Sequence, residues 1–161
     1  MDNPFKGLKI LPSCLNKQTL MLIGLYSEKA RKHIIQIRNK INDLKLEHNY
    51  KNIIKFRKDL IESNNDQLND IISSPDFYTV SGVRDLLFHV QEHRFTISKI
   101  KEYLDKLGLI FLGFEDQLVK ENFKKIYSNK IDLYNLDKWE EYEKNNPRIF
   151  AGMYQFWCKK I

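Results

Sequence analysis

The sequence lacks the short glycine motifs that hold phosphate-bearing cofactors. Its six glycines are scattered singly over 161 residues. Neither GxGxxG, nor GxxxxGK followed by Ser or Thr, nor the GxSxG elbow of many hydrolases occurs. In open α/β sheets, such a cofactor lies at a glycine-rich turn where a helix follows the first strand. The sequence therefore predicts no cofactor loop of this kind in the chain.

Cysteines and long apolar runs are also scarce. Cys14 and Cys158 allow one disulfide, but neither a disulfide framework nor a zinc site built from CxxC pairs. No apolar run approaches the ~20 residues of a membrane span, and residues 1–9 have no signal-peptide core. We therefore expect a cytoplasmic protein without a membrane segment.

The charge of the chain is modestly positive, with a net charge of +6 and a pI of about 9.2. Basic residues alternate with acidic ones instead of gathering, as in Lys99, Lys101, Glu102 and Asp105. This pattern argues against a nucleic-acid partner, whose site needs clustered positive charge. A hydrophobic content of 42% and an aromatic content of 12% are enough for the core of one domain.

Short apolar runs predict about three strands, near 20–26, 109–114 and 152–158. The first two runs are continuously apolar, which is typical of strands buried on both faces in a parallel sheet. In the third, Tyr154, Phe156 and Cys158 are expected to share one face. No strand is predicted before 20–26, so this chain reads as the back half of an α/β domain.

Helical spacing of apolar residues fills most of the rest. Helices are predicted over 4–15 with an interruption at Pro12, over two or three segments within 28–73, and around 83–90, 97–107, 115–127 and 136–145. Thr96 and Gly108 have the residue types that cap a helix at its start and end. The predicted organisation is one incomplete domain: helix and strand in 1–27, a helical insertion in 28–95, and the remaining elements in 96–161.

The spacing His89–His93, with Glu92 between, matches the HxxEH zinc-hydrolase signature. On one helical turn both histidines would bind zinc, Glu92 would act as general base, and Glu140 or Glu143 would supply a third ligand. A hydrogen-bonded junction without metal is the alternative interpretation of the same residues.

The end of the first predicted strand is a candidate site, because ligands bind at the carboxyl ends of strands in open α/β sheets. Tyr26 and Ser27 lie there, and an ordinary turn with a capping serine is the alternative. Asp76, Phe77, Tyr78, Arg84 and Asp85 lie in or beside a later loop. Arg84 and Asp85 would either recognise a charged substrate or pair with neighbours.

Several strings, taken together, resemble the later part of class I S-adenosylmethionine-dependent methyltransferases. The strings are Met1–Leu8, Leu20–Ser27, Arg84–Thr96, Leu109–Glu115 and Asn146–Trp157. Asn16–Thr19 departs from the family pattern, which has a Lys-Pro-Gly-Gly turn at this point. The last three strings resemble a bacterial subgroup in which tetratricopeptide repeats often precede the methyltransferase domain.

The resemblance implies the C-terminal half of a Rossmann-like methyltransferase fold. S-adenosylmethionine would be the cofactor, although the family motifs that bind it precede Met1. The chain would then be a truncated, split or mis-started gene product. On the substrate side, the resemblance and the position of the residues suggest Tyr26, Ser27, Tyr78, Arg84 and His89, with His93 or Glu92 as the base.

Other functions stay open at this point. A gene remnant or a non-enzymatic interaction module is the first alternative, and a zinc hydrolase is the second. The expected partners are the missing N-terminal half or a tetratricopeptide-repeat protein, and an exposed sheet edge would allow self-association.

Overall fold

The computed structural model describes residues 3–14, 16, 19–63, 68–88, 91–150 and 152–161. The chain divides into two compact units, which are described separately. Unit 1 consists of Met1–Ala30 and His93–Ile161, and unit 2 is Arg31–Glu92. Unit 2 lies inside the stretch 28–95 that the sequence predicts to be a helical insertion.

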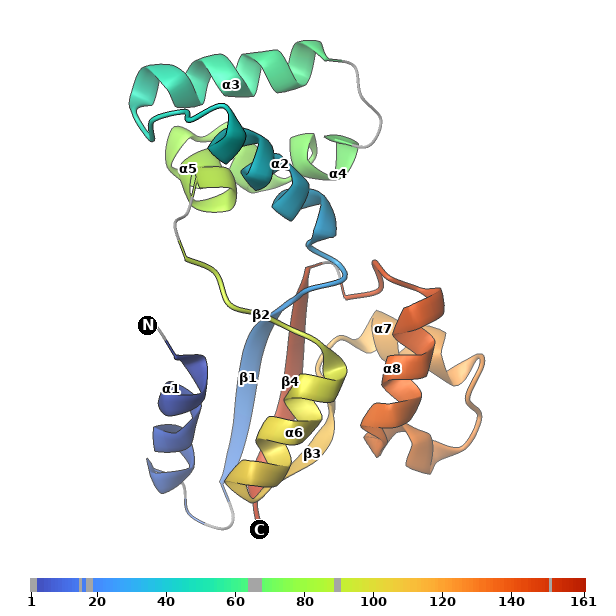
Figure 1. Cartoon of the computed structure of the whole chain (residues 1–161). Coiled ribbons are helices and arrows are strands. Elements are labelled where there is room, and N and C mark those ends of the chain that lie inside the picture. Colours follow the sequence, from blue (N-terminus) through green and yellow to red (C-terminus); the bar gives the residue numbers. More distant parts are fainter. Residues whose placement is uncertain (1–2, 15, 17–18, 64–67, 89–90, 151) are drawn as a thin grey trace. The chain divides into compact units, whose positions relative to one another are not determined.

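Unit 1 is built on a mixed sheet of four strands, counted over the described residues (Figure 1). The strands are β1 (Leu20–Ser27), β2 (Arg94–Phe95), β3 (Leu109–Phe114) and β4 (Met153–Lys160), in the order β2-β1-β4-β3. β4 runs antiparallel to both β1 and β3, while β2 pairs parallel with β1 through Tyr26 and Ser27. β1, β2 and β3 therefore all point the same way.

One face of this sheet, here called the inner face, forms the core of unit 1. It presents Ile23, Phe111, Tyr154, Phe156 and Cys158, all buried. Three amphipathic helices pack their apolar sides on it: α6 (Ile97–Leu107), α7 (Gln117–Lys124) and α8 (Leu136–Asn145). An aromatic stack joins α7 to α8, because the rings of Phe123 and Trp139 lie 3.7 Å apart at 20°. Both side chains are fully buried.

The helix ends follow the local chemistry of the sequence. The backbone N–H of Lys99 donates to Thr96 Oγ1 at 3.2 Å, which confirms Thr96 as the N-cap of α6. Gly108 ends the same helix with φ +63°, a left-handed conformation that costs glycine little, as predicted. α1 (Pro4–Ile10) begins at the cap Asn3 and gives way to a 3₁₀ helix over Leu11–Cys14, so Pro12 does interrupt the helical pattern.

The secondary-structure elements of unit 2 are all helical within its described residues. It contains α2 (Lys32–Asp43), α3 (Tyr50–Glu62), α4 (Asn69–Ile72), a 3₁₀ turn over Pro75–Tyr78 and α5 (Val80–Phe88). Buried side chains from each segment form an apolar core of their own, which consists of Ile34, Ile37, Ile41, Ile53, Phe56, Leu60, Ile71, Phe77, Val83, Leu86, Leu87 and Phe88. Most of these residues lie on the apolar helical stripes of the sequence, but Leu44, Ile54 and Ile61 of the same stripes are exposed.

The α/β class and the three predicted strands are confirmed, and two expectations need correction. The apolar runs of β1 and β3 are not buried on both faces, since Leu20, Leu22 and Ile110 are 54%, 47% and 40% exposed. Their principal partner is an antiparallel strand, not a parallel one. The sequence did not predict the strand β2, because a strand of two residues is too short to show an alternation of apolar and polar side chains.

Candidate functional site

The strand ends of unit 1 converge at one end of the sheet, here called the carboxyl end. β1, β2 and β3 finish there at Ser27, Phe95 and Phe114, and β4 starts there at Met153. The backbone joins these ends, because Glu28 N donates to Phe95 O and Ser27 N donates to Gly152 O, each at 2.9 Å. Ligands of open α/β sheets bind at such an end.

A buried carboxylate lies at this carboxyl end. Glu143, on α8, is fully buried and accepts hydrogen bonds at Oε1 from Tyr154 Oη at 2.5 Å and from Ser27 Oγ at 3.3 Å. Lys29 Nζ lies 2.9 Å from Oε2. The side chains of Ser27, Lys29, Glu143 and Tyr154 are called the Glu143 cluster below. A buried charge is tolerated only with such partners, since its removal from water is costly.

The phenol of Tyr154 has a strongly perturbed pKa. Burial, and then the hydrogen bond to Glu143, raise the pKa of the Tyr154 phenol far above its ordinary value of about 10. The phenol therefore stays protonated and donates to the carboxylate at any ordinary pH. This bond ties α8 to the start of β4.

Lys29 is the part of the cluster nearest to solvent. Its side chain is 29% exposed, yet its ammonium nitrogen and Glu143 Oε2 are both shielded from water. Their contact is an ion pair, and neither atom makes a hydrogen bond of good geometry with any described residue. The ion pair therefore holds the turn after β1 in place. Because Lys29 and Glu143 are paired with each other, neither is available as a free acid or base.

The two predicted residues at the end of β1 have different surroundings. Ser27 is buried, and its Oγ accepts from the backbone N–H of Ala30 at 3.1 Å as well as donating to Glu143. It is thus the capping serine of the turn. Tyr26 lies on the opposite side of the strand, half-buried, in register with Met153 and Arg94. His93, half-buried, directly precedes β2 in the same unit.

The other predicted residues belong to unit 2. Tyr78 is 64% exposed at the end of the 3₁₀ turn, and its backbone carbonyl accepts from Arg57 Nη1 at 3.3 Å. Arg84 is exposed on α5. His89 lies outside the described residues. The structure therefore brings Tyr26 and Ser27 together on β1 and places Tyr78 and Arg84 on the surface of the other unit.

Glu92, the other predicted base, is held by two arginines of unit 2. Arg31 donates from Nε to Oε1 at 3.0 Å and from Nη2 to Oε2 at 2.8 Å, and Arg38 Nη2 lies 2.9 Å from Oε2. The carboxylate is nearly buried, at 6% exposure. Such bidentate pairs are strong and directional. They join the first and last residues of unit 2, Arg31 and Glu92.

The zinc interpretation needs His89 and His93 on one helix. α5 ends at Phe88, and the described residues 91–93 are not helical. Within the described ranges, no group of three or more His, Cys, Asp or Glu side chains is placed to hold a metal ion.

The contacts of Lys29 and Tyr154 with Glu143 were not predicted from the sequence. Glu143 entered the sequence argument only as a candidate zinc ligand. Its position one residue after Tyr142 and four after Trp139 puts it on the buried side of α8, together with those two side chains. The signal in the sequence that could have revealed the buried position of Glu143 was an acidic residue on the apolar stripe of a predicted helix.

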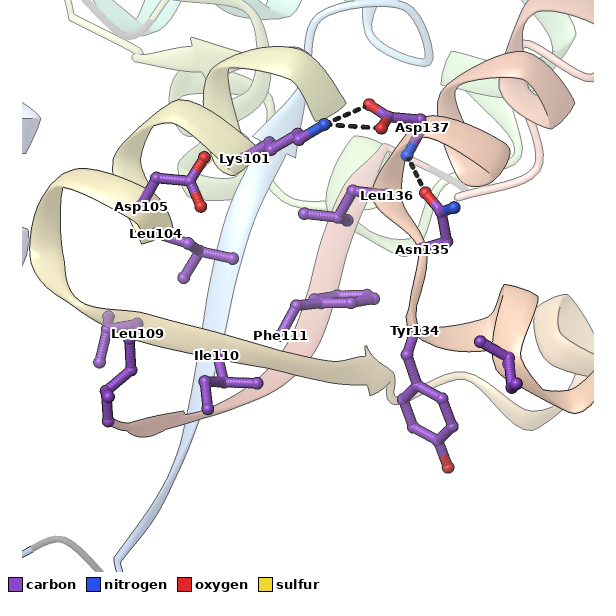
Figure 2. Close-up of a pocket in the computed structure, with 12 residues that line it drawn as sticks. Lys101, Leu104, Asp105, Leu109, Ile110, Phe111, Tyr134, Asn135, Leu136 and Asp137 are labelled. Atoms are coloured by element: carbon purple, nitrogen blue, oxygen red, sulfur yellow. Dashed lines mark hydrogen bonds and ion pairs between the residues drawn. The ribbon is translucent and has the colours of Figure 1, made fainter.

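A cavity of about 510 Å³ lies elsewhere on unit 1, beside the edge strand β3 (Figure 2). Its walls include Leu109 at the start of β3 and Ile161 after β4, so it opens at the opposite end of the sheet from the Glu143 cluster. Figure 2 shows Lys101 of α6 reaching Asp137 of α8, at 2.6 Å. None of the site residues predicted from the sequence lines this cavity.

No helix in the described part of the chain is long and apolar enough to cross a membrane. No protein-family model matches the sequence, and no curated protein matches it significantly.

Solved structures do match. The methyltransferase PKMT2 from Rickettsia typhi is similar over 98% of this chain and 32% of that chain, with a TM-score of 0.63 and 13% identity. The structure of PKMT2 from Rickettsia typhi in complex with AdoHcy matches over 97% and 32%, with a TM-score of 0.54 and 12% identity. The chain thus spans about a third of the length of these structures. The likeness shows that it has a methyltransferase-like α/β fold.

Proposed function

We propose that this chain is the C-terminal, substrate-side part of an S-adenosylmethionine-dependent methyltransferase. The observation that carries the proposal is the match of nearly the whole chain to one third of PKMT2, one structure of which is in complex with AdoHcy. Fold alone does not define chemistry. The carboxyl end of the sheet adds support, since it holds a rigid, hydrogen-bonded cluster where α/β enzymes bind their ligands.

The cofactor itself would be held by residues supplied from outside this chain. β1 is followed by Glu28–Arg31 and then α2, with no glycine-rich turn at the start of that helix. Ser27 and Glu143 at the same end already bond to each other and to Tyr154. These residues do not fit a cofactor cradle.

The chain would contribute to methyl transfer by positioning. Holding an acceptor in line with the reacting methyl supplies much of the rate enhancement in such a reaction. The Glu143 cluster would fix the end of β1 and so the direction of Tyr26. Tyr26, Tyr78, Arg84 and His89 remain the proposed acceptor-side residues. Ser27, proposed with them from the sequence, is fully buried and caps the turn after β1, so it would act only through the position of that turn.

Of the two proposed bases, Glu92 is the one whose surroundings the structure describes in detail, and they do not suit proton transfer. Both oxygens of Glu92 already accept hydrogen bonds from Arg31, and Arg38 adds a second positive charge beside Oε2. A general base must reach the proton that it removes. In this proposal Glu92 acts as a positioning residue, since it holds the chain segment directly before His93.

The test is a methyl-transfer assay with radiolabelled S-adenosylmethionine. It compares the chain alone, the polypeptide encoded immediately upstream, and the two together, with a total bacterial protein extract as acceptor. We expect label in protein only when both are present, and a large loss of label with His93→Ala but not with Tyr134→Ala, an exposed control on the far side of unit 1. Full transfer by the upstream polypeptide alone would contradict the proposal.

A non-enzymatic interaction module is the second candidate, because one face of the sheet in unit 1 is apolar and exposed. A tetratricopeptide-repeat protein or a second copy of the chain would be its partner. Sedimentation of the purified chain distinguishes these: a concentration-dependent dimer favours self-association, and a monomer favours a different partner.

A further inference from the structure

The sheet of unit 1 has a second face, here called the outer face. Along β1 and β4 its residues alternate with the inward-facing ones, and they are Leu20, Leu22 and Gly24 of β1 and Gln155, Trp157 and Lys159 of β4. On β3 the outer face includes Ile110, which pairs with Lys159, and Gly113, which pairs with Trp157; Leu112 lies between them at a register shift that breaks the alternation. Leu20 and Leu22 are about half exposed and Ile110 is 40% exposed. Leu112 and Trp157 are half-buried. The core helices α6, α7 and α8 pack on the inner face instead.

The strand register makes the outer face continuous. Leu22 lies opposite Trp157, and Lys159 lies between Leu20 on one neighbouring strand and Ile110 on the other. Facing residues of paired strands lie on the same side of a sheet, so these side chains form adjoining rows. The result is a mainly apolar strip that also contains Gln155 and Lys159, and the indole N–H of Trp157 donates to the carboxylate of Glu115.

The outer face has more apolar residues than a solvent-exposed sheet face normally has. An antiparallel sheet with one wet face normally alternates apolar and polar residues, whereas β1 and β3 carry leucine and isoleucine outward as well as inward. Contiguous exposed apolar patches usually mark an interaction site. In addition, no described strand pairs with Leu20–Leu25 on the side away from β4, because β2 reaches only Tyr26 and Ser27.

We infer that the outer face is the docking surface for the polypeptide that completes the methyltransferase fold. This inference rests on the proposed function. The matched structures continue for about two thirds of their length outside the aligned part, and sheets of α/β domains are covered by helices on both faces. The partner segment should be an amphipathic helix with an apolar side toward Leu22 and Trp157 and an acidic side chain opposite Lys159.

The first experiment measures association with the polypeptide encoded immediately upstream, by co-expression and size-exclusion chromatography. Leu22→Asp places a charge in the strip, and Leu118→Asp is the matched control, since Leu118 is 66% exposed on α7, outside the outer face. We expect Leu22→Asp to weaken association at least tenfold and Leu118→Asp to leave it unchanged. Equal association of both variants, or no association of the unchanged chain, would overturn the inference.

The second experiment uses the chain alone, with the dye 8-anilinonaphthalene-1-sulfonate as the probe of exposed apolar surface. We expect strong fluorescence that falls with Leu22→Asp and Ile110→Asp but not with Leu118→Asp. Unchanged melting temperatures would show that the variants still fold. Equal fluorescence in all variants would place the exposed apolar surface elsewhere and contradict the inference.

The outcomes separate docking from catalysis. Association that depends on Leu22 without any methyl transfer supports the docking surface and removes the proposed function. Methyl transfer by a complex that Leu22→Asp leaves intact supports the function and removes the docking surface. A dimer of the chain alone that Leu22→Asp dissociates makes a second copy the occupant and overturns the choice of partner.

Discussion

The two faces of the sheet in unit 1 are built from similar apolar residues but have different surroundings. The inner face is covered by α6, α7 and α8, and Tyr154, Phe156 and Cys158 are essentially inaccessible there. On the outer face, the leucines of β1 and Ile110 of β3 are exposed. The difference teaches that apolar residues on both sides of a strand do not by themselves show that both faces are buried. Among the described residues, the core helices α6, α7 and α8 pack on the inner face.

The two tryptophans of the chain test this contrast most strongly, because one lies on each side. Trp139 is fully buried against Phe123 and Phe114, whereas Trp157 is half-buried on the outer face. We expect Trp139→Ala to lower the free energy of unfolding by about 3–5 kcal/mol. Trp157→Ala should cost about 1 kcal/mol. Denaturant unfolding measures both losses in free energy. Equal losses for the two variants would contradict the difference in burial between the two faces.

The Glu143 cluster is the next largest effect, because it adds a buried charge to the covered side. Glu143→Ala leaves the Tyr154 hydroxyl and the Lys29 ammonium without their partner. We expect a loss of about 3 kcal/mol in the free energy of unfolding. Glu143→Gln should cost less, since an amide oxygen still accepts from Tyr154. A larger loss with glutamine than with alanine would argue against the cluster as an anchor.

The pH dependence of stability tests the burial of the inner face. Burial raises the pKa of Cys158 to about 11, from an ordinary thiol value of about 8.5. Because the folded state holds this proton longer than the unfolded chain does, stability is complete below about pH 8.5 and falls as the pH rises toward 11. The slope should be about 1.4 kcal/mol per pH unit.

Cys158→Ala removes this titration and serves as the control. In that variant the alkaline loss should begin only near pH 10, where unfolded tyrosine ionises while Tyr154, with its raised pKa, does not. An identical alkaline profile for the variant and the unchanged chain would mean that the Cys158 thiol is not buried in solution. Thermal unfolding between pH 7 and 11 gives the comparison.

The smallest effect on stability is expected on the outer face. Leu22→Ser removes an exposed apolar side chain and should change the free energy of unfolding by no more than about 0.5 kcal/mol. Its neighbour Ile23 faces inward and is 6% exposed, so Ile23→Ala should cost about 2–4 kcal/mol. Chemical denaturation of the two variants compares the outer and inner faces at adjacent residues of β1.

Most of the fold follows from patterns visible in the sequence. Apolar spacing predicted the helices of unit 2 and α6, and the types of Thr96 and Gly108 predicted the ends of α6. The alternation in 152–158 assigned Tyr154, Phe156 and Cys158 to one face correctly. These features depend on residues near in sequence, so local spacing is enough to reveal them.

The rest depends on contacts between distant residues, which spacing does not encode. The antiparallel pairing of β1 with β4 joins residues more than 120 positions apart. The edge strand β2 pairs with β1 through Tyr26 and Arg94, which are also far apart in the sequence. The bond between Glu143 and Ser27 spans 116 positions. The hydrogen bond from Arg31 to Glu92 joins residues 61 positions apart. The roles predicted for Tyr78, Arg84, His89 and His93 stay predictions, because they concern a bound acceptor.

The central claim is that this chain is the substrate-side part of a methyltransferase fold and needs another polypeptide to bind the cofactor. Isothermal titration calorimetry with S-adenosylmethionine tests it most directly, first on the purified chain and then on its complex with the upstream-encoded polypeptide. We predict no measurable binding to the chain alone and saturable binding to the complex. Micromolar binding to the chain alone would contradict the account.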